Sequence, residues 1–155
     1  MIHKTFFFFF FLFCSAAGAQ SRADALLGKW LSTDRNVAVE IFKKDGDYRA
    51  KVLWFDETMG SGKPLHQRHD TENPDPDLRK RKIIGMEILD GLQYNSRLNS
   101  WEKGRIYDAS SGRYWDSAAT ITANGLLKVR GYWKYKWIGK TMTFTKTTLT
   151  ALSKL

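Results

Sequence analysis

Cysteine, proline and long apolar runs are scarce in this chain of 155 residues, and each of these features limits the structures that the chain can form. The single cysteine, Cys14, cannot form an internal disulfide, so stability has to come from the burial of apolar side chains. All three prolines lie between residues 64 and 76, and the rest of the chain is therefore open to continuous strand pairing. The apolar stretch from Phe6 to Phe13 is far shorter than the roughly 20 residues that a transmembrane helix needs.

The first 19 residues have the pattern of a cleaved secretory signal peptide. Lys4 gives the positive start, the Phe-rich run gives the apolar region, and Ala17-Gly18-Ala19 is a small-residue cleavage site, so cleavage is expected after Ala19. An uncleaved amino-terminal anchor is the alternative, and the shortness of the apolar run disfavours it. The sequence thus predicts a periplasmic or secreted protein in which residues 20–155 form one domain.

The chain has fewer acidic residues (16) than basic ones (25), so its formal net charge is +9, or +8 once Lys4 is removed with the signal peptide. Such an excess predicts attraction to polyanions. Nucleic acid is a poor match for an exported chain, which leaves anionic lipid headgroups or envelope polysaccharides as expected neighbours. The chain has no G-x-S-x-G nucleophile motif and no phosphate-binding glycine loop, and no cofactor is predicted.

Apolar and polar residues alternate over short segments from residue 28 onward, which is typical of half-buried strands. Asp45-Gly46 and Asn124-Gly125 are hairpin turn signals, because type I′ turns need positive φ at both central residues. Residues 23–27, after Ser21, indicate a short amino-terminal helix. The predicted fold is all-β, a single eight-stranded antiparallel up-and-down barrel that removes exposed edges, with a flattened β-sandwich as the alternative. We expect a Trp-rich inner face.

One segment, Asp56 to about Lys82, breaks the alternation and contains all the prolines. Loops of this length in compact domains are uncommon, and they tend to be functional or disordered. Its charges are segregated, with acidic residues followed by Arg79-Lys80-Arg81-Lys82. We predict that Arg79 or Arg81 pairs with one of the acidic residues and pins the loop to the barrel rim. The candidate partners are Asp70, Asp75 and Asp77. Strands are expected to resume at Ile84.

The segment from about residue 28 to residue 146 resembles the exported bacterial proteins grouped as domain of unknown function 2147. The matching positions are Asn73-Pro74-Asp75-Pro76, Arg79, Arg81, Gly85, Ile88-Leu89, Gly104, Ile106-Tyr107-Asp108, Ser111-Gly112, Val129-Arg130-Gly131-Tyr132, Gly139 and Thr141. Ala109 departs from the pattern, since the family usually has proline there. The resemblance implies a small lipocalin-like (calycin-type) envelope barrel and implies no established activity.

Several residues of the loop, together with Asp108, have side chains of the types used in catalysis or metal binding. His66 and His69 with a carboxylate are zinc ligand types, but their spacing aligns them only on a helix, so solvated histidines are favoured and no metal is predicted. Asp70, Asp75 and Asp108 are candidates for general acid and base catalysis, which needs two carboxylates at a set separation. Aspartate beside proline is also an ordinary turn former, and this structural interpretation is favoured.

The sequence therefore favours a non-enzymatic envelope protein that binds a small amphiphilic or anionic ligand. The alternatives are a hydrolase that uses the loop carboxylates or His66 and His69, and a purely structural role in envelope maintenance. Arg130 is interpreted either as an outward charge of a strand or as a partner of Tyr107 and Asp108. The candidate binding residues are Asp70, Asn73, Asp75, Arg79, Arg81, Tyr107, Asp108 and Arg130.

Overall fold

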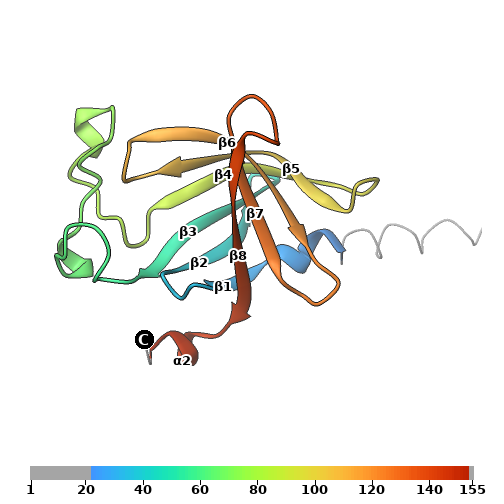
Figure 1. The fold of residues 1–155 in the computed structure, drawn as a ribbon, viewed down its shortest axis with the longest axis horizontal. Coiled ribbons are helices and arrows are strands. Elements are labelled where there is room, and N and C mark those ends of the chain that lie inside the picture. The colour runs from blue at the N-terminus through green and yellow to red at the C-terminus, as the bar shows by residue number, and fades with distance from the viewer. Residues whose placement is uncertain (1–21, 154–155) are drawn as a thin grey trace, which may run out of the picture.

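The computed structural model describes residues 22–153, which form a closed barrel of eight antiparallel strands (Figure 1). The strands are β1 (Gly28–Ser32), β2 (Val37–Lys44), β3 (Asp47–Phe55), β4 (Glu87–Asn95), β5 (Ser100–Asp108), β6 (Arg113–Ile121), β7 (Leu127–Tyr132) and β8 (Gly139–Thr147). Each pairs with the next along the chain, and β1 closes the barrel by pairing with β8. The predicted up-and-down barrel is confirmed, and the alternative sandwich is not formed.

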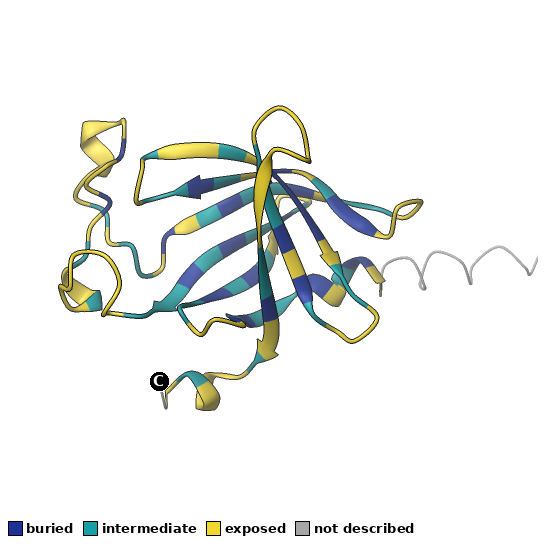
Figure 2. Ribbon diagram, viewed as in Figure 1, coloured by how far each residue is buried: buried dark blue, intermediate teal, exposed yellow. Residues whose placement is uncertain are grey.

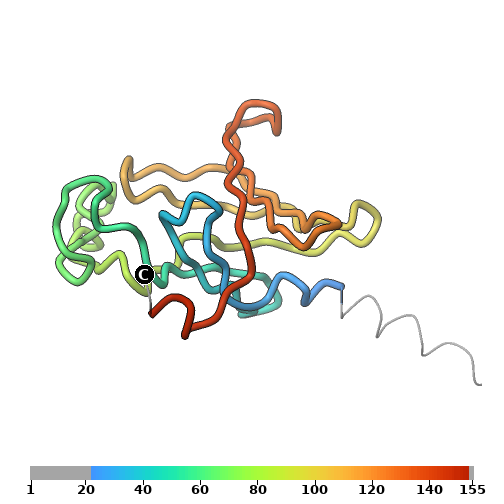
Figure 3. Tube along the Cα trace, turned by 60° about the horizontal axis from the view of Figure 1, so that its bottom comes forward, coloured from blue at the N-terminus to red at the C-terminus, as the bar shows by residue number. Residues whose placement is uncertain are grey.

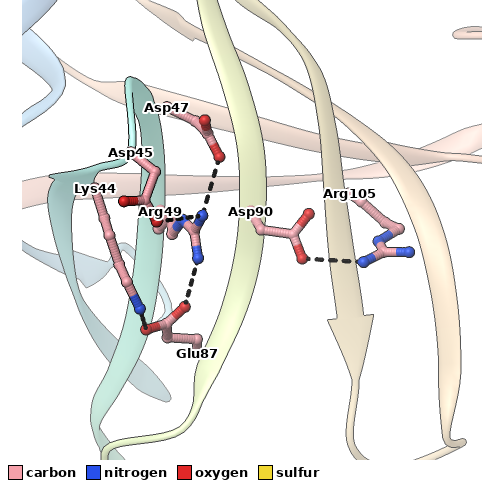
Figure 4. A network of polar contacts seen from close by, with 7 residues as sticks. All are labelled: Lys44, Asp45, Asp47, Arg49, Glu87, Asp90 and Arg105. Carbon is pink, nitrogen blue, oxygen red and sulfur yellow. Dashed lines mark hydrogen bonds and ion pairs between the residues drawn. The ribbon is translucent and has the colours of Figure 1, made fainter.

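The first hairpin follows the predicted alternation. On β3, Tyr48, Ala50 and Val52 are buried in the barrel core, while Arg49 and Lys51 lie between them on the outer face. Figure 4 shows that Arg49 takes part in a surface network of ion pairs and contacts Asp45, Asp47 and Glu87 at 3.4 Å. Arg105 on β5 extends this ladder of outward charges by pairing with Asp90 on β4.

Strand β4 differs from the expected alternation. It begins at Glu87, because the backbone turns just before it. Gly85, two residues earlier, has a φ of +84° and donates its N–H to the carbonyl of Val52. Its buried residues, Leu89 and Leu92, are three positions apart, since β4 carries an extra residue relative to β3 between them. The strand therefore starts three residues later than the sequence predicts.

One end of the barrel, which we call the closed end, is covered by the amino-terminal 3-10 helix η1 (Asp24–Leu26). Leu26 is fully buried, and its carbonyl accepts a 2.9 Å hydrogen bond from the indole of Trp30. The indole of Trp101 donates to the carbonyl of Ala23 at 3.0 Å. Trp30 and Trp101 are thus core residues beneath this helix, and each such buried side chain contributes about 1.5–3 kcal/mol.

The opposite end of the barrel, which we call the open end, carries the connections 33–36, 56–86, 109–112 and 133–138. Figure 2 shows that exposed residues dominate 56–86 and 133–138, whereas buried residues lie along the strands. The remaining short helices are η2 (Leu65–Gln67), η3 (Pro76–Leu78) and α2 (Leu149–Leu152). Within residues 22–153, every helix is too short or too polar to span a bilayer. The predicted signal peptide, residues 1–19, and Ser21 lie outside the described residues.

Candidate functional site

The buried carboxylate of Asp70 organises the long loop at the open end. Asp70 is fully buried, and its Oδ1 accepts a 2.6 Å hydrogen bond from the hydroxyl of Tyr107 on β5. Its Oδ2 accepts from the amide of Asn73 and from the guanidinium of Arg81, both at 2.7 Å. The predicted ion pair between the loop's basic and acidic runs is confirmed, with Arg81 and Asp70 as the partners.

The same contacts set the protonation states of Asp70 and Tyr107. Burial by itself raises the pKa of the Asp70 carboxyl, but the hydrogen bonds from Tyr107, Asn73 and Arg81 outweigh it and hold this pKa below its usual range. Burial and the neighbouring Asp70 carboxylate raise the pKa of the Tyr107 hydroxyl. The pair is therefore an ionised carboxylate bound by a neutral phenol at neutral pH.

The Asn73-Pro74-Asp75-Pro76 segment shapes the loop next to this carboxylate. Asn73 is buried, its side-chain oxygen accepts from the N–H of Asp75, and its carbonyl accepts from Arg79 Nε at 2.8 Å. The Asp75 carboxylate in turn accepts from the N–H of Asp77 and caps η3. Asp70, Asn73, Arg79, Arg81 and Tyr107, which the sequence singled out, are thus brought together, and their polar atoms largely bind one another.

The turn between β5 and β6 packs directly against the loop. Asp108 holds this turn together, because its carboxylate accepts hydrogen bonds from the hydroxyls of Ser110 and Ser111. Gly112 has a φ of +68°, and a Cβ there would lie only 1.9 Å from the carbonyl oxygen of Glu72. Glycine is required at this position both for its backbone conformation and for the close approach of the loop.

Arg130 lies apart from this network. It occupies β7 opposite Ala118 and Thr141, and its guanidinium donates to the carbonyl of Lys136 and, at 2.9 Å, to the Thr141 hydroxyl. Of the two interpretations offered by the sequence, the structure supports the outward strand charge. Its contacts brace the β7–β8 connection.

The two loop histidines do not form a metal-binding cluster. His66 lies on η2 and contacts the side chain of Gln67, while His69 pairs with Lys82 in an isolated backbone bridge. Among residues 22–153, no group of three or more His, Cys, Asp or Glu side chains is placed to hold a metal ion.

An apolar groove lies at the start of β6, beside the turn that the Asp70 network supports. It is open to solvent, has a volume of about 560 Å³, and is lined by Arg113, Tyr114, Trp115 and Trp133. Trp115 and Trp133 meet edge to face with their ring centroids 6.1 Å apart. We call this the aromatic groove. Its volume is within the range of small-molecule sites, and one arginine lines it together with three aromatic residues.

The Asp70 network and the aromatic groove are physically linked. The ring of Tyr107, whose hydroxyl binds Asp70, packs against the ring of Tyr114 with centroids 4.9 Å apart. On the same ring of Tyr114, the guanidinium of Arg105 lies 4.7 Å from the centroid. The buried carboxylate therefore fixes the position of one wall of the groove through Tyr107.

A second hollow of about 420 Å³ lies at the closed end, among residues of η1, β5 and the β6–β7 turn. Its lining includes Trp101 and Ile121 with the polar side chains of Arg22, Asn99 and Thr122. Trp101 is 2% exposed and is committed to the core. The aromatic groove is the stronger candidate site, since its aromatic side chains are accessible.

Tyr114, Trp115 and Trp133 are not among the candidate residues that the sequence indicates, so sequence reasoning missed the groove that they line. Tyr114 and Trp115 are adjacent aromatic residues at the start of a strand. Because successive side chains of a strand point to opposite faces, the core cannot take both, and this pattern could have indicated accessible aromatic surface. The pairing of Trp115 with Trp133 was not accessible, since it depends on the register of β6 against β7. The groove therefore depends on the pairing of the neighbouring strands β6 and β7.

Comparison with known proteins gives a family and a fold. A family model described as "Uncharacterized protein conserved in bacteria (DUF2147)" matches residues 28–146. The chain is also similar to protein HP1028 of the human pathogen Helicobacter pylori, which is reported to belong to the lipocalin family. That similarity has 23% sequence identity and a TM-score of 0.68, and it covers 83% of this chain and 87% of HP1028. No curated protein matches the chain.

Proposed function

The chain belongs to the DUF2147 family of uncharacterized bacterial proteins, and we propose that it is a non-enzymatic binder of a small amphiphile with an anionic headgroup. The closed barrel supports this proposal, because the pairing of β6 with β7 holds the residues of the groove beside one another at the open end. The predicted signal peptide supports the proposal, because export to the periplasm or beyond the cell would bring the protein to lipid-derived amphiphiles.

The aromatic groove is the single observation that carries the proposal. Its 560 Å³ and its rings of Tyr114, Trp115 and Trp133 suit an alkyl chain, since aromatic side chains provide large rigid apolar surfaces. Arg113 at its border suits a phosphate or carboxylate headgroup, because a guanidinium binds such groups with two parallel hydrogen bonds. The ligand class is therefore an anionic amphiphile.

The predicted binding residues of the loop take a supporting role in this proposal. Asp70 and Asn73 are buried and their side chains already bind protein partners, so they position the groove wall through Tyr107. Arg79 and Asp75 shape the loop backbone beside them. The proposed ligand contacts instead come from the adjacent start of β6.

A hydrolase is less well supported by the geometry. Asp70 is inaccessible and its pKa is lowered, whereas a general acid needs a carboxyl with a raised pKa. The carboxylate of Asp108 accepts hydrogen bonds within its own turn, and its pKa is lowered despite partial burial. A structural role in envelope maintenance remains the outcome expected if no amphiphile binds.

Titration with decyl phosphate below its micelle-forming concentration tests the proposal. Two of the six tryptophans, Trp115 and Trp133, line the groove, so we expect saturable quenching or a blue shift of tryptophan fluorescence. Decyl maltoside has the same alkyl chain and a neutral headgroup, and it is expected to bind more weakly. Absence of saturable binding by decyl phosphate, with the protein folded, contradicts the proposal.

Two substitutions locate the site. Trp115→Leu removes one ring of the groove and is expected to weaken binding of decyl phosphate about tenfold. Arg113→Gln is expected to weaken decyl phosphate about threefold to tenfold and to leave decyl maltoside unchanged. Trp54→Leu and Arg97→Gln, which lie outside the groove, serve as matched controls. Equal losses in the control variants exclude the groove as the site.

A further inference from the structure

The connection between β7 and β8, residues 133–138, presents large apolar side chains to solvent. Trp137 is 75% exposed, Trp133 55%, Tyr135 52% and Ile138 51%. Figures 1 and 3 show this connection, coloured orange to red, projecting away from the barrel. We call it the aromatic loop. The barrel does not bury these four side chains. An exposed apolar cluster of this kind often marks an interaction surface.

The aromatic loop is built as a defined structure. The N–H of Trp133 donates to the carbonyl of Ile138 at 3.0 Å, and the N–H of Ile138 donates to the carbonyl of Tyr135 at 2.9 Å. The rings of Tyr135 and Trp137 stack with centroids 4.6 Å apart and an interplanar angle of 11°. The loop therefore holds its apolar side chains together in one arrangement.

Contacts at the base of the loop hold it against the barrel. Arg130 donates to the carbonyl of Lys136, and Lys136 forms an ion pair with Glu102 of β5. Gly139 allows the two strands to approach closely, because a Cβ there would lie 2.2 Å from the carbonyl oxygen of Gly131. These contacts orient the stacked rings away from the core.

Positive charge is concentrated in the same part of the chain. Residues 117–155 contain seven Lys and Arg and no Asp or Glu, so they supply seven of the nine net positive charges. Within the loop itself, Lys134 and Lys136 alternate with Trp133, Tyr135 and Trp137. Lys134 forms no ion pair among the described residues, and its charge remains available to an external anion.

We propose that the aromatic loop is a docking surface for anionic lipid bilayers. Tryptophan and tyrosine side chains favour the membrane interface, where the ring enters the apolar region and the polar atom stays hydrated. The negative surface potential of an anionic bilayer attracts nearby lysine side chains and so strengthens binding. The positive charge of the loop therefore favours an anionic membrane surface over a neutral apolar partner. The alternation of Lys with aromatic residues suits such a surface, because the rings can enter the apolar region while the lysines contact the headgroups.

Binding to large unilamellar vesicles tests the docking surface in the mature protein. Vesicles of phosphatidylcholine with phosphatidylglycerol are expected to co-sediment the protein, and vesicles of phosphatidylcholine alone are expected to retain much less. Added salt should weaken binding, because it screens the charge attraction. Equal binding to both vesicle types, or none to the anionic vesicles, overturns the proposal.

Variants at the loop tip have matched controls at the closed end. Tyr135→Ala combined with Trp137→Ala is expected to weaken vesicle binding about tenfold or more. Lys134→Asn is expected to weaken it about fivefold, and Asn suits the positive φ of 60° at this residue. Leu98→Ala, which truncates a side chain 64% exposed, and Arg97→Asn are expected to bind as the unmodified protein does.

The outcomes separate docking from ligand binding in the groove. Trp115→Leu should keep vesicle binding while it loses decyl phosphate, and the Tyr135→Ala and Trp137→Ala pair should do the reverse. Loss of vesicle binding in Trp115→Leu alone overturns the assignment to the loop. A concentration-dependent dimer that the tip variants abolish, with no vesicle binding, would assign the loop to a second copy of the chain and overturn membrane docking.

Discussion

The hydroxyl of Tyr107 on β5 donates a 2.6 Å hydrogen bond to the carboxylate of Asp70, which lies in the long loop and is fully buried. This bond joins the one irregular segment of the chain to the regular barrel. The Tyr107 ring also packs against Tyr114, the first aromatic wall of the groove. The loop therefore acts on the candidate site by holding this wall in place.

Removal of the Tyr107 hydroxyl tests that bond. Tyr107→Phe leaves Asp70 Oδ1 buried without its donor, so we expect the free energy of unfolding to fall by about 1–3 kcal/mol. Urea denaturation measures this change. Tyr114→Phe is the control, because Tyr114 is 42% exposed, and its expected effect is within about 0.5 kcal/mol. Similar losses in the two variants would contradict a special role for Tyr107.

Two substitutions of Asp70 separate its charge from its hydrogen bonds. Asp70→Asn keeps the shape, and its amide oxygen can still accept from Asn73 and Arg81, so the expected loss is about 1–2 kcal/mol. Asp70→Leu leaves all three donors unpaired, and the expected loss is about 3–5 kcal/mol. Thermal denaturation ranks the two. A leucine variant as stable as the asparagine variant would contradict the network.

Stability is expected to depend on pH through Asp70. Its pKa in the folded protein lies below the unfolded value of about 3.9, so its stabilising contribution is complete above that value. The contribution is lost as the pH falls through the folded pKa. The stability difference between the unmodified protein and Asp70→Asn should therefore shrink on acidification below about pH 4. A difference independent of pH would contradict the lowered pKa.

The contact between Gly112 and the loop gives a further prediction. Gly112→Ala places a Cβ against the Glu72 carbonyl at a position of positive φ, and we expect a loss of about 3 kcal/mol or more. Trypsin cleavage near Arg79–Lys82 should accelerate as the loop detaches. Gly125→Ala also has positive φ but meets nothing within 4 Å, so it should cost only about 1–2 kcal/mol and leave cleavage unchanged.

The barrel was largely predictable because strand and turn signals are local. Tyr48, Ala50 and Val52 face the core as their alternation indicates, and turns form at Asp45-Gly46 and Asn124-Gly125. Only the first turn has the predicted positive φ at both residues, because at the second turn Gly125 alone has it. An ion pair such as that of Asp70 with Arg81 could be predicted, because the acidic and basic residues are segregated within one loop, although the sequence left several partners open. Its burial beneath Tyr107 was not, since that contact depends on how a long loop folds back onto β5.

The candidate groove was beyond sequence reasoning for a related reason. Trp115 and Trp133 lie on different elements, and only the register of β6 against β7 brings their rings together. The exposure of Trp137 was also contrary to expectation, because a Trp-rich inner face was predicted and only Trp30 and Trp101 are buried in the core. Periodicity identifies the faces of a strand, but it carries no information about residues in a protruding loop.

The most direct test of amphiphile binding is a two-dimensional ¹H–¹⁵N NMR titration of the mature protein with decyl phosphate below its micelle-forming concentration. Saturable shifts concentrated at the backbone amides of Arg113, Tyr114 and Trp115 and at the indole of Trp133 are predicted, since these residues line the aromatic groove. Shifts confined to the hollow at the closed end, around Asn99 and Ile121, or the absence of any saturable shift, would contradict the account.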